Sequence, residues 1–369
     1  MRVVVAGAGI GGLAAAIGLR AGGHEVVVLE RADRIDPIGA GITLFANAMS
    51  ALERLGVARA VAARGSGARS SAILTSSGDV LASLPSDLLS GLVALHRADL
   101  QAVLESAAGE VRLGSAVTSV EQDPSTVVAH CADGGAVAGD LIVGADGLNS
   151  TVRRSVAAGE PKYAGYTAWR GVAEIATEPG RLTESWGRGE RFGLVDIGGA
   201  RTYWFATKNA PEGERDVPGD RKVELVERYS PWHPPIAGML EATEETVILR
   251  NDVYYVEPLP RWRNGRVVLL GDAAHAVTPG AGQGAAQAIE DAVVLVSQLA
   301  NQRDVPTALQ AFEATRRPRV ETVLRVSRRA DRVAQMASPL GCRLRNAALR
   351  LLPATAQRRD LGPLIQHRV

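Results

Sequence analysis

A glycine-rich turn near the N-terminus constrains the fold of this chain more than any other feature. The segment Gly7-Ala8-Gly9-Ile10-Gly11-Gly12 joins an apolar, β-branched run at residues 2–6 to an apolar-periodic helix expected over residues 11–20. In such a pattern the first glycine permits a tight turn, the second lets the backbone approach a pyrophosphate, and the third allows close helix–sheet contact. The helix N-terminus adds free N–H groups and the positive end of a dipole. The turn therefore predicts a βαβ unit that binds a dinucleotide.

The second strand of this unit is expected over residues 25–30 and ends in Glu30, about twenty residues after the turn. A carboxylate at that place accepts hydrogen bonds from ribose hydroxyls. A glycine-rich turn without a ligand is the alternative, and the pattern does not choose between FAD and NAD.

Two further motifs follow buried strands. Gly144-Ala145-Asp146-Gly147-Leu148-Asn149-Ser150 comes after a strand expected over residues 140–144, although Asp and Ser also suit an ordinary turn and helix cap. Gly271-Asp272-Ala273-Ala274-His275 comes after a strand at residues 266–270, and Gly282 to Ala286 then opens a helix expected over 284–300. Asp272 can accept a bond from a ribityl hydroxyl, and the helix N-terminus would favour negative charge on a flavin ring. A second βα turn without a ligand is the alternative.

The segments between these motifs predict the domain organisation. Residues 165–208 contain several aromatic-rich strands, which indicate a mostly antiparallel sheet, followed by helices at 221–229 and 234–241 and a strand at 246–256. Arginine-rich helices are expected over 306–352. We therefore predict an α/β fold in which a Rossmann-like domain, residues 1–160 with 260–300, is interrupted by a substrate-binding sheet domain, residues 161–259. Residues 301–369 form a C-terminal helical region.

Composition excludes several classes of protein. The chain has 41 Lys and Arg against 40 Asp and Glu, a net charge of +1, which gives no support for nucleic-acid binding. Its two cysteines, Cys131 and Cys342, fit neither a disulfide framework nor a metal motif and indicate reduced thiols in the cytoplasm. No apolar stretch approaches the ~20 residues of a membrane span, and no signal peptide is expected.

The three motifs in this order resemble the single-component, group A FAD-dependent aromatic monooxygenases of the para-hydroxybenzoate hydroxylase type, over roughly residues 1–325. The resemblance implies an FAD-binding domain of the glutathione reductase 2 type with non-covalently bound FAD. It also carries the family's FAD contacts over to a set of residues in this chain. These are Gly7, Gly9, Gly11, Gly12, Glu30, Arg31, Thr43 after Gly39-Ala40-Gly41, Arg97, Val117, Asp146, Asp272, Gly282, Gln283, Gly284, Ala285 and Ala286.

The resemblance implies a mechanism as well. NADH or NADPH reduces FAD, and the reduced flavin takes O2 to give a C4a-hydroperoxide that hydroxylates, or epoxidises, an electron-rich aromatic or heteroaromatic ring. The expected partners are this small aromatic substrate, NAD(P)H and O2, in a monomer or homodimer. The alternatives are a flavin oxidoreductase that does not insert oxygen, a halogenase, whose usual Trp-x-Trp-x-Ile-Pro signature is absent here, and a non-catalytic flavoprotein.

Within the family the chain is most similar to urate, 3-hydroxybenzoate and salicylate hydroxylases. The resemblance implies that Arg191 binds an anionic or carbonyl oxygen of the substrate and that Tyr203 orients it; a solvated strand residue and a core aromatic are the alternatives. Ala168 and Gly280 stand where the urate enzyme has Asn and Asp. We therefore expect a less polar and larger aromatic substrate than urate.

His275 and the C-terminal arginines each allow two interpretations. His275 belongs to the family pattern, and a structural role is expected for it rather than that of a base. The arginines from Arg316 to Arg359 are compatible with a membrane surface. Because acidic and apolar residues are interspersed among them, a solvated helical face is the favoured interpretation.

Overall fold

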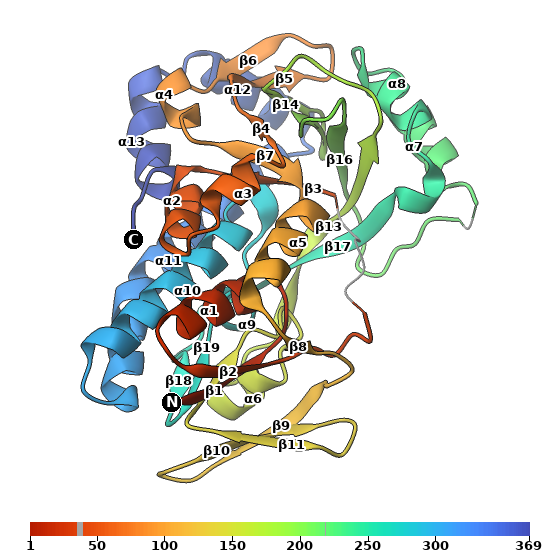
Figure 1. The fold of residues 1–369 in the computed structure, drawn as a ribbon. Helices are drawn as coiled ribbons and strands as arrows, with labels where there is room; N and C mark the ends of the chain where they lie inside the picture. Colours follow the sequence, from red (N-terminus) through yellow and green to blue (C-terminus); the bar gives the residue numbers. More distant parts are fainter. Residues whose placement is uncertain (35–39, 218) are drawn as a thin grey trace.

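The computed structural model describes residues 1–34, 40–217 and 219–369 (Figure 1). Within these ranges the central sheet has the order β18-β19-β12-β1-β2-β8. Its strands are β1 (Arg2–Ala6), β2 (Glu25–Leu29), β8 (Val111–Arg112), β12 (Leu141–Gly144), β18 (Arg263–Asn264) and β19 (Val267–Leu269). All neighbours pair in parallel except β18 and β19. The carboxyl ends of β1, β2, β12 and β19 therefore lie at one edge of the sheet.

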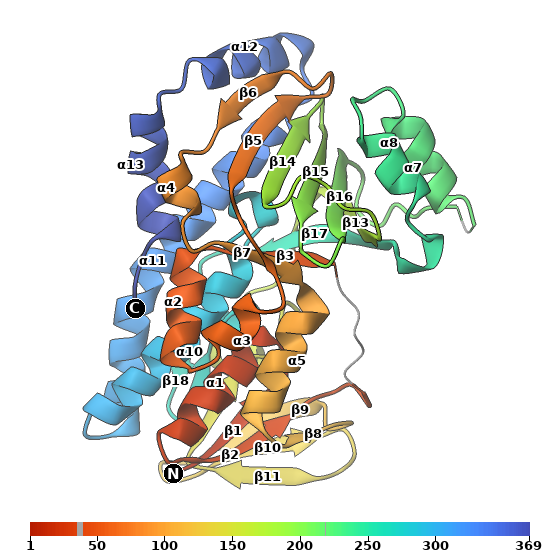
Figure 2. The same cartoon turned by 45° about the horizontal axis from the view of Figure 1, so that its top comes forward.

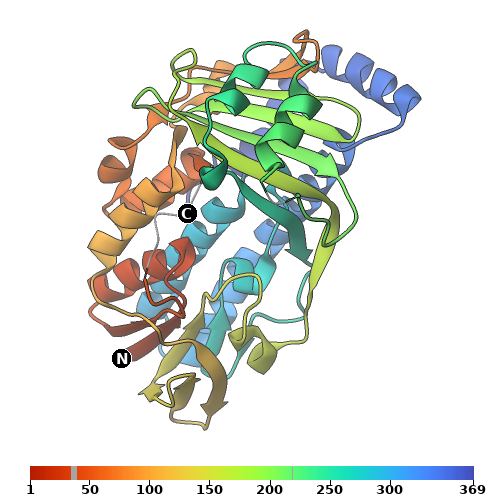
Figure 3. The same ribbon diagram turned by 90° about the vertical axis from the view of Figure 1, so that its right-hand side faces the viewer.

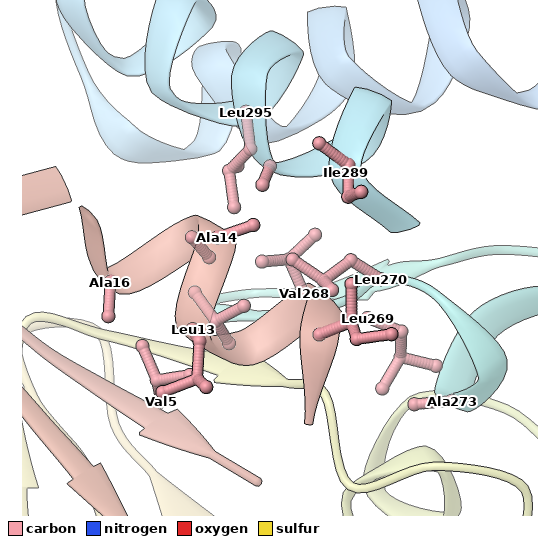
Figure 4. Close-up of a cluster of buried hydrophobic side chains, with 14 of the residues drawn as sticks. Val5, Leu13, Ala14, Ala16, Val268, Leu269, Leu270, Ala273, Ile289 and Leu295 are labelled. Carbon is pink, nitrogen blue, oxygen red and sulfur yellow. The ribbon is translucent and has the colours of Figure 1, made fainter. Parts of the chain in front are cut away.

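The parallel strands are valine-rich because both of their faces are covered. Helices α1 (Ile10–Ala21) and α10 (Gly284–Asn301) pack on one face, and Figure 4 shows Leu13 of α1 and Ile289 of α10 in the same apolar cluster as Val5 and Leu269. The other face is covered by a small antiparallel sheet of β9 (Val117–Gln122), β10 (Val127–Cys131) and β11 (Ala136–Gly139).

A second large sheet has the order β17-β13-β16-β15-β14-β5-β6. Its strands are β5 (Ser70–Thr75), β6 (Val80–Ser83), β13 (Pro161–Ala173), β14 (Arg181–Trp186), β15 (Glu190–Asp196), β16 (Thr202–Asn209) and β17 (Leu249–Val256). It is antiparallel except where β14 pairs with β5. Helices α7 (Arg221–Tyr229) and α8 (Ile236–Glu241) cover one face through a core around Trp204 and Phe192 (Figure 3). The other face is turned toward the rest of the molecule.

Shorter elements connect the two large sheets. A three-stranded sheet of β3 (Gly41–Leu44), β7 (Val93–His96) and β4 (Ser66–Gly67) lies between them (Figure 2). The remaining elements are α2 (Ala46–Arg54), α3 (Ala58–Ala62), α4 (Ser86–Leu89), α5 (Arg97–Ala108), α6 (Val152–Val156), η1 (Glu245–Val247), α9 (Asp272–His275), η2 (Pro279–Ala281), α11 (Val305–Ala334), α12 (Pro339–Arg350) and α13 (Ala354–Ile365).

The predicted α/β fold class is confirmed, since a Rossmann-like parallel sheet, a mostly antiparallel sheet and C-terminal helices are all present. The expectation that the arginines from residue 316 onward form a solvated face is wrong in part. Arg316 is 1% and Arg345 6% exposed, because each is held by partners inside the fold. Among the described residues, no helix combines the length and the apolar character needed to cross a bilayer.

Candidate cofactor and substrate site

The glycine turn leaves β1 in a conformation that requires glycine. Gly7 has φ +103°, and a Cβ atom there would lie 2.4 Å from the carbonyl oxygen of Ala145, which follows β12. A Cβ atom on Gly12 would collide with the Gly7 carbonyl oxygen, whereas one on Gly9 would meet nothing within 4 Å. The first and third glycines therefore hold strand, turn and helix together. The second leaves open space in front of the N-terminus of α1, where a pyrophosphate needs to approach.

Glu30 lies directly after β2 and beside this turn. Its carboxylate accepts hydrogen bonds from the backbone N–H of Ala8 at 2.7 Å and of Ala32 at 3.0 Å. On the other side of the turn, the Gln101 side chain donates to the Ala8 carbonyl oxygen at 2.7 Å. Sequence-distant side chains thus fix the turn, and the predicted contact of Glu30 with a ribose stays a prediction.

Asp146 lies at the end of β12, against the glycine turn, and its carboxylate is occupied by the chain itself. It accepts hydrogen bonds from the Ser150 hydroxyl and from the backbone N–H groups of Thr151 and Val152, at 2.7 and 3.1 Å. The Asp146 carboxylate thus holds the loop that leads into α6, and the bond into the first turn of that helix is the one that Ser150 Oγ accepts from the Arg153 backbone N–H at 2.9 Å. The predicted role of Asp146 toward FAD and the nicotinamide cofactor stays a prediction.

Asp272 begins α9, just after the φ +57° residue Gly271 at the end of β19. Its carboxyl is reached by solvent, yet desolvation by the surrounding protein raises its pKa, against the opposing charges of His275, Arg97 and Arg153. Asp272 thus lies at the carboxyl edge of the parallel sheet, near enough to Arg97 for that charge to act on its carboxyl. Its predicted contact with the ribityl chain stays a prediction.

A buried ion-pair network holds the Asp272 turn in place. Asp291 of α10, which is fully buried, accepts a hydrogen bond from the Gly271 backbone N–H at 2.9 Å and contacts His275 Nε2 at 2.6 Å. Arg316 of α11 donates to the same carboxylate at 2.7 Å and to Glu290 at 2.5 Å. His275 is 3% exposed, in agreement with the structural role that the sequence analysis favoured.

The turn before α10 lies on the same network. Gly282 has φ +62° and is exposed, and the buried Gln283 side chain accepts a hydrogen bond from Asn47 at 2.9 Å. Residues 284–286 form the first turn of this 18-residue helix, so their N–H groups have no partner within the helix. A Cβ atom on Gly282 would lie 3.4 Å from the Phe45 ring, which places the turn beside the end of β3.

The other predicted FAD contacts are more widely distributed. Thr43 lies on β3, opposite Ala94 of β7, and the Arg97 backbone N–H donates to the Ala40 carbonyl oxygen at 2.9 Å. Gly39 of the same motif lies outside the described residues. Arg31 is exposed after β2, and Val117 is half-buried at the start of β9.

Together these residues fit an FAD molecule. Open space at Gly9, the Glu30 carboxylate, the Asp272 carboxyl and the N-terminus of α10 would face the pyrophosphate, ribose, ribityl chain and flavin ring in that order. Gly11 contributes indirectly, because a Cβ atom there would lie 2.9 Å from Leu270 and would push α1 away from the sheet.

Tyr203 lies on the inner face of the seven-stranded sheet, against β3. A Cβ atom on Gly41 would lie 2.3 Å from its ring, so ring and backbone are in direct contact. The hydroxyl lies beside the Arg170 guanidinium, and burial raises its pKa although that cation opposes the rise. Tyr203 therefore stays protonated at neutral pH and can orient a ligand by hydrogen bonding, but not act as a phenolate base.

Arg191 lies on the same face but in another part of it. Arg191 of β15 pairs with Thr207 of β16, whereas Tyr203 of β16 pairs with Val195 of β15. Arg191 and Tyr203 are therefore four positions apart along the strands, a distance of roughly 13 Å. Arg191 is 4% exposed and donates to Glu184 at 3.2 Å and to Asp331 of α11 at 3.0 Å. Two carboxylates thus surround this cation, and its predicted contact with a substrate oxygen stays a prediction.

The sequence analysis missed Arg170 and Asp331. β13 and β16 pair in antiparallel register, with Arg170 opposite Phe205 and Val172 opposite Tyr203. Because paired residues point to the same face, Arg170 lies on the inner face with Tyr203. This alternation was visible in the sequence, but the pairing of the strands was not. Asp331 lies on an arginine-rich helix for which the sequence predicts a solvated face, whereas it is 5% exposed and binds Arg191.

Comparison with known proteins gives one family and close structural relatives. A family model described as an FAD binding domain matches residues 1–327. The "Aurachin C monooxygenase/isomerase" of Stigmatella aurantiaca is 41% identical over 362 residues, which cover 95% of this chain and 94% of that protein. The "2-heptyl-3-hydroxy-4(1H)-quinolone synthase" of Pseudomonas aeruginosa is 34% identical over 371 residues, 97% and 96% of the two chains.

A solved structure extends the similarity to the fold. The crystal structure of Klebsiella pneumoniae HpxO complexed with FAD and uric acid superimposes with a TM-score of 0.92 at 29% identity, and covers 99% of this chain and 96% of that chain.

Proposed function

The chain belongs to the FAD binding domain family and is an FAD-dependent monooxygenase, and on this premise we propose its substrate class and the residues with which it acts. The observation that carries the proposal is the meeting of the Gly7 turn, Glu30, Asp272 and the N-terminus of α10 at one sheet edge, with the sheet face that bears Tyr203 beyond it. When bound, reduced FAD would activate O2, from which one oxygen atom enters the aromatic ring and the other leaves as water.

We propose that the co-substrate is NADH or NADPH and that the enzyme works in the cytoplasm as a monomer or homodimer. The two free, buried thiols of Cys131 and Cys342 support a reducing compartment. We also propose the division into an FAD-binding part, residues 1–160 and 260–300, a substrate part, 161–259, and a helical region, 301–369. The strands at 70–75 and 80–83 pair with the sheet of the substrate part.

The protein orients the substrate and excludes water around the reacting ring. Tyr203 holds a proton that it can donate to a substrate oxygen, and Arg170 beside it favours partial negative charge on that oxygen. Gly41, pressed against the Tyr203 ring, and the surrounding cluster of Ala40, Ala94 and Val195 exclude water from this part of the face.

The charges around Arg191 argue for an uncharged substrate. Glu184 and Asp331 together carry one more negative charge than Arg191 can balance, so a substrate anion there would meet a net negative site. At Gly280 a Cβ atom would lie 2.6 Å from Asp331 Oδ1, which leaves no room for a polar side chain. The space that a side chain at position 280 would need is therefore filled by Asp331 itself.

We propose a neutral heteroaromatic substrate, larger and less polar than urate. The 2-heptyl quinolone in the name of the Pseudomonas aeruginosa relative gives an example of such a ring with an alkyl chain. Alkylquinolones and urate should therefore be compared as stimulants of NAD(P)H oxidation and O2 uptake, with transfer of label from 18O2 to the product as the readout. Efficient hydroxylation of urate would refute the substrate class. Oxidation of NAD(P)H without label in any organic product would instead support an oxidoreductase that does not insert oxygen.

The FAD assignment has its own test. Asp272→Ala should release most of the FAD during gel filtration, because the carboxylate that would accept a ribityl hydroxyl is lost. Asp360→Ala, at an exposed position on α13, is the matched control and should stay yellow. An Asp272→Ala protein that retains FAD as the wild type does would contradict the assignment.

A further inference from the structure

Helix α12 exposes an apolar face that the proposed function does not use. Leu340, Leu344 and Leu351 are 66%, 63% and 82% exposed, and their spacing of four and seven residues places them on one side of the helix. The opposite side is anchored: Arg345 lies 5.3 Å from the Trp186 ring centroid and donates to the Ala334 carbonyl oxygen at 3.2 Å. The helix is thus firmly docked on one side and apolar on the other.

A groove borders this face on the side of the helix where Arg345 is docked. It has a volume of about 450 Å³ and lies between the end of α11 and helix α12, lined mainly by Val333, Met336, Leu344, Ala348, Leu349 and Leu352. Figure 2 shows α12 at the outer margin of the molecule, above β6, where no other element covers it. A hydrocarbon chain fits such an apolar groove, because no charged group of the lining except the docked Arg345 would lose its hydration.

The charges carried by this segment of the chain all have one sign. The sequence contains no Asp or Glu from Arg332 to Arg359. Arg332, Arg343 and Arg350 are exposed, and within the described residues no ion pair is recorded for Arg343 or Arg350. On the helix, Arg343 and Arg350 are seven residues apart and flank the leucines on the same side. Exposed leucines bordered by arginines form the pattern of a helix that lies in a membrane interface.

We propose that α12 docks this enzyme on an anionic lipid surface, with its leucines among the upper acyl chains and Arg343 and Arg350 at the headgroups. A second copy of the chain is the less favourable occupant. A two-fold contact through this face would bring the arginines of one copy against those of the other. Anionic lipid provides the complementary charge that another copy lacks.

The position of this face next to the substrate sheet connects membrane docking to the delivery of an apolar substrate. The Gln335 side chain, at the end of α11, accepts hydrogen bonds from Arg191 at 3.1 Å and Thr207 at 3.0 Å, and the Met336 carbonyl accepts one from Gly189 at 2.8 Å. The segment that leads into α12 therefore touches the inner sheet face directly. An apolar substrate dissolved in the lipid would leave the membrane next to the sheet on which we place the substrate. This consequence rests on the proposed function, but the docking does not.

Co-sedimentation of the FAD-loaded protein with vesicles tests the docking. Vesicles of equal parts phosphatidylcholine and phosphatidylglycerol should bind the protein at low salt, and phosphatidylcholine vesicles should bind it at least about tenfold more weakly, because the attraction to arginines is electrostatic. Leu344→Ser with Leu351→Ser, and separately Arg343→Ala with Arg350→Ala, should each weaken binding at least about tenfold. Retained FAD absorbance shows that the variants are folded.

Matched controls use exposed residues elsewhere. Val223→Ser on α7, where valine is 54% exposed, and Arg59→Ala on α3 should leave vesicle binding unchanged. Wild-type protein that stays in the supernatant with the anionic vesicles overturns the proposal, as does binding that the α12 variants do not alter. Light scattering that shows a dimer abolished by the leucine variants, without vesicle binding, assigns the face to self-association and also overturns it. Loss of catalysis on apolar substrates with vesicle binding intact would count against the proposed function only.

Discussion

Replacing Arg316 by methionine should destabilise the protein strongly, because its guanidinium is the shared cation of two buried carboxylates. Arg316 is 1% exposed and lies 2.7 Å from Asp291 and 2.5 Å from Glu290, both of which are fully buried. Removing one member of a buried ion pair costs about 3–5 kcal/mol. Glu290 keeps Arg319 at 2.6 Å and Asp291 keeps His275, so we expect the lower end of that range. Urea unfolding followed by tryptophan fluorescence measures the loss.

The adjacent residue provides the control. Arg317 pairs with Glu321 at 2.9 Å and with Glu313 at 3.5 Å, but it is 32% exposed, so Arg317→Met should cost less than about 1 kcal/mol. Because Asp291 also holds the backbone before Asp272, Arg316→Met should release FAD at lower urea than the wild type does. Equal losses for the two variants, or a loss below about 1 kcal/mol for Arg316→Met, would refute the reasoning.

Three further predictions concern the turn, the substrate face and pH. Gly7→Ala should lower the free energy of unfolding by about 1–3 kcal/mol and weaken FAD binding, because alanine is strained at φ +103° and its Cβ atom meets a carbonyl oxygen. Unchanged flavin retention would contradict this. Tyr203→Phe should keep FAD but lower kcat at least about tenfold, because the hydroxyl beside Arg170 is lost; an unchanged kcat on the best substrate would remove Tyr203 from the proposed site. Burial alone would raise the pKa of Asp291, but His275 and Arg316 lower it, and the net shift is downward. The contribution of Asp291 to stability should therefore be present above the unfolded pKa of about 3.9 and disappear as the pH falls through the folded pKa. Asp291→Asn should flatten that part of the pH–stability curve, and a curve identical to the wild type would argue against the paired carboxylate.

The local parts of the fold could be predicted from the sequence. Valine runs ending in glycine predict buried parallel strands, and the structure has β1 and β2 within one residue of the expected bounds. The expected helix at 284–300 appears as Gly284–Asn301 for the same reason, since its apolar period and preceding glycine both act locally.

The rest depended on pairing between distant segments, which a single sequence does not contain. Arg170 faces Tyr203 only because β13 and β16 pair in one register, and a shift by one residue would turn Arg170 to the opposite face. Arg316 is buried because its partners are presented by α10, although its helical surroundings are those of a solvated arginine. The turn and cap formed by Asp146 and Ser150 before α6 were foreseen only as an alternative, since the same side chains suit a turn and a ligand.

The parallel pairing of β12 with β19 has a consequence for how the protein is made. Residues 141–144 leave the ribosome well before residues 267–269, and the whole substrate sheet is synthesised between them. Until β19 emerges, the growing chain carries an unpaired, fully apolar strand edge at β12, which is open to pairing with another chain. The Asp272 turn and the N-terminus of α10 emerge later still. The elements on which we place the flavin ring are thus among the last parts of the parallel-sheet domain to be synthesised.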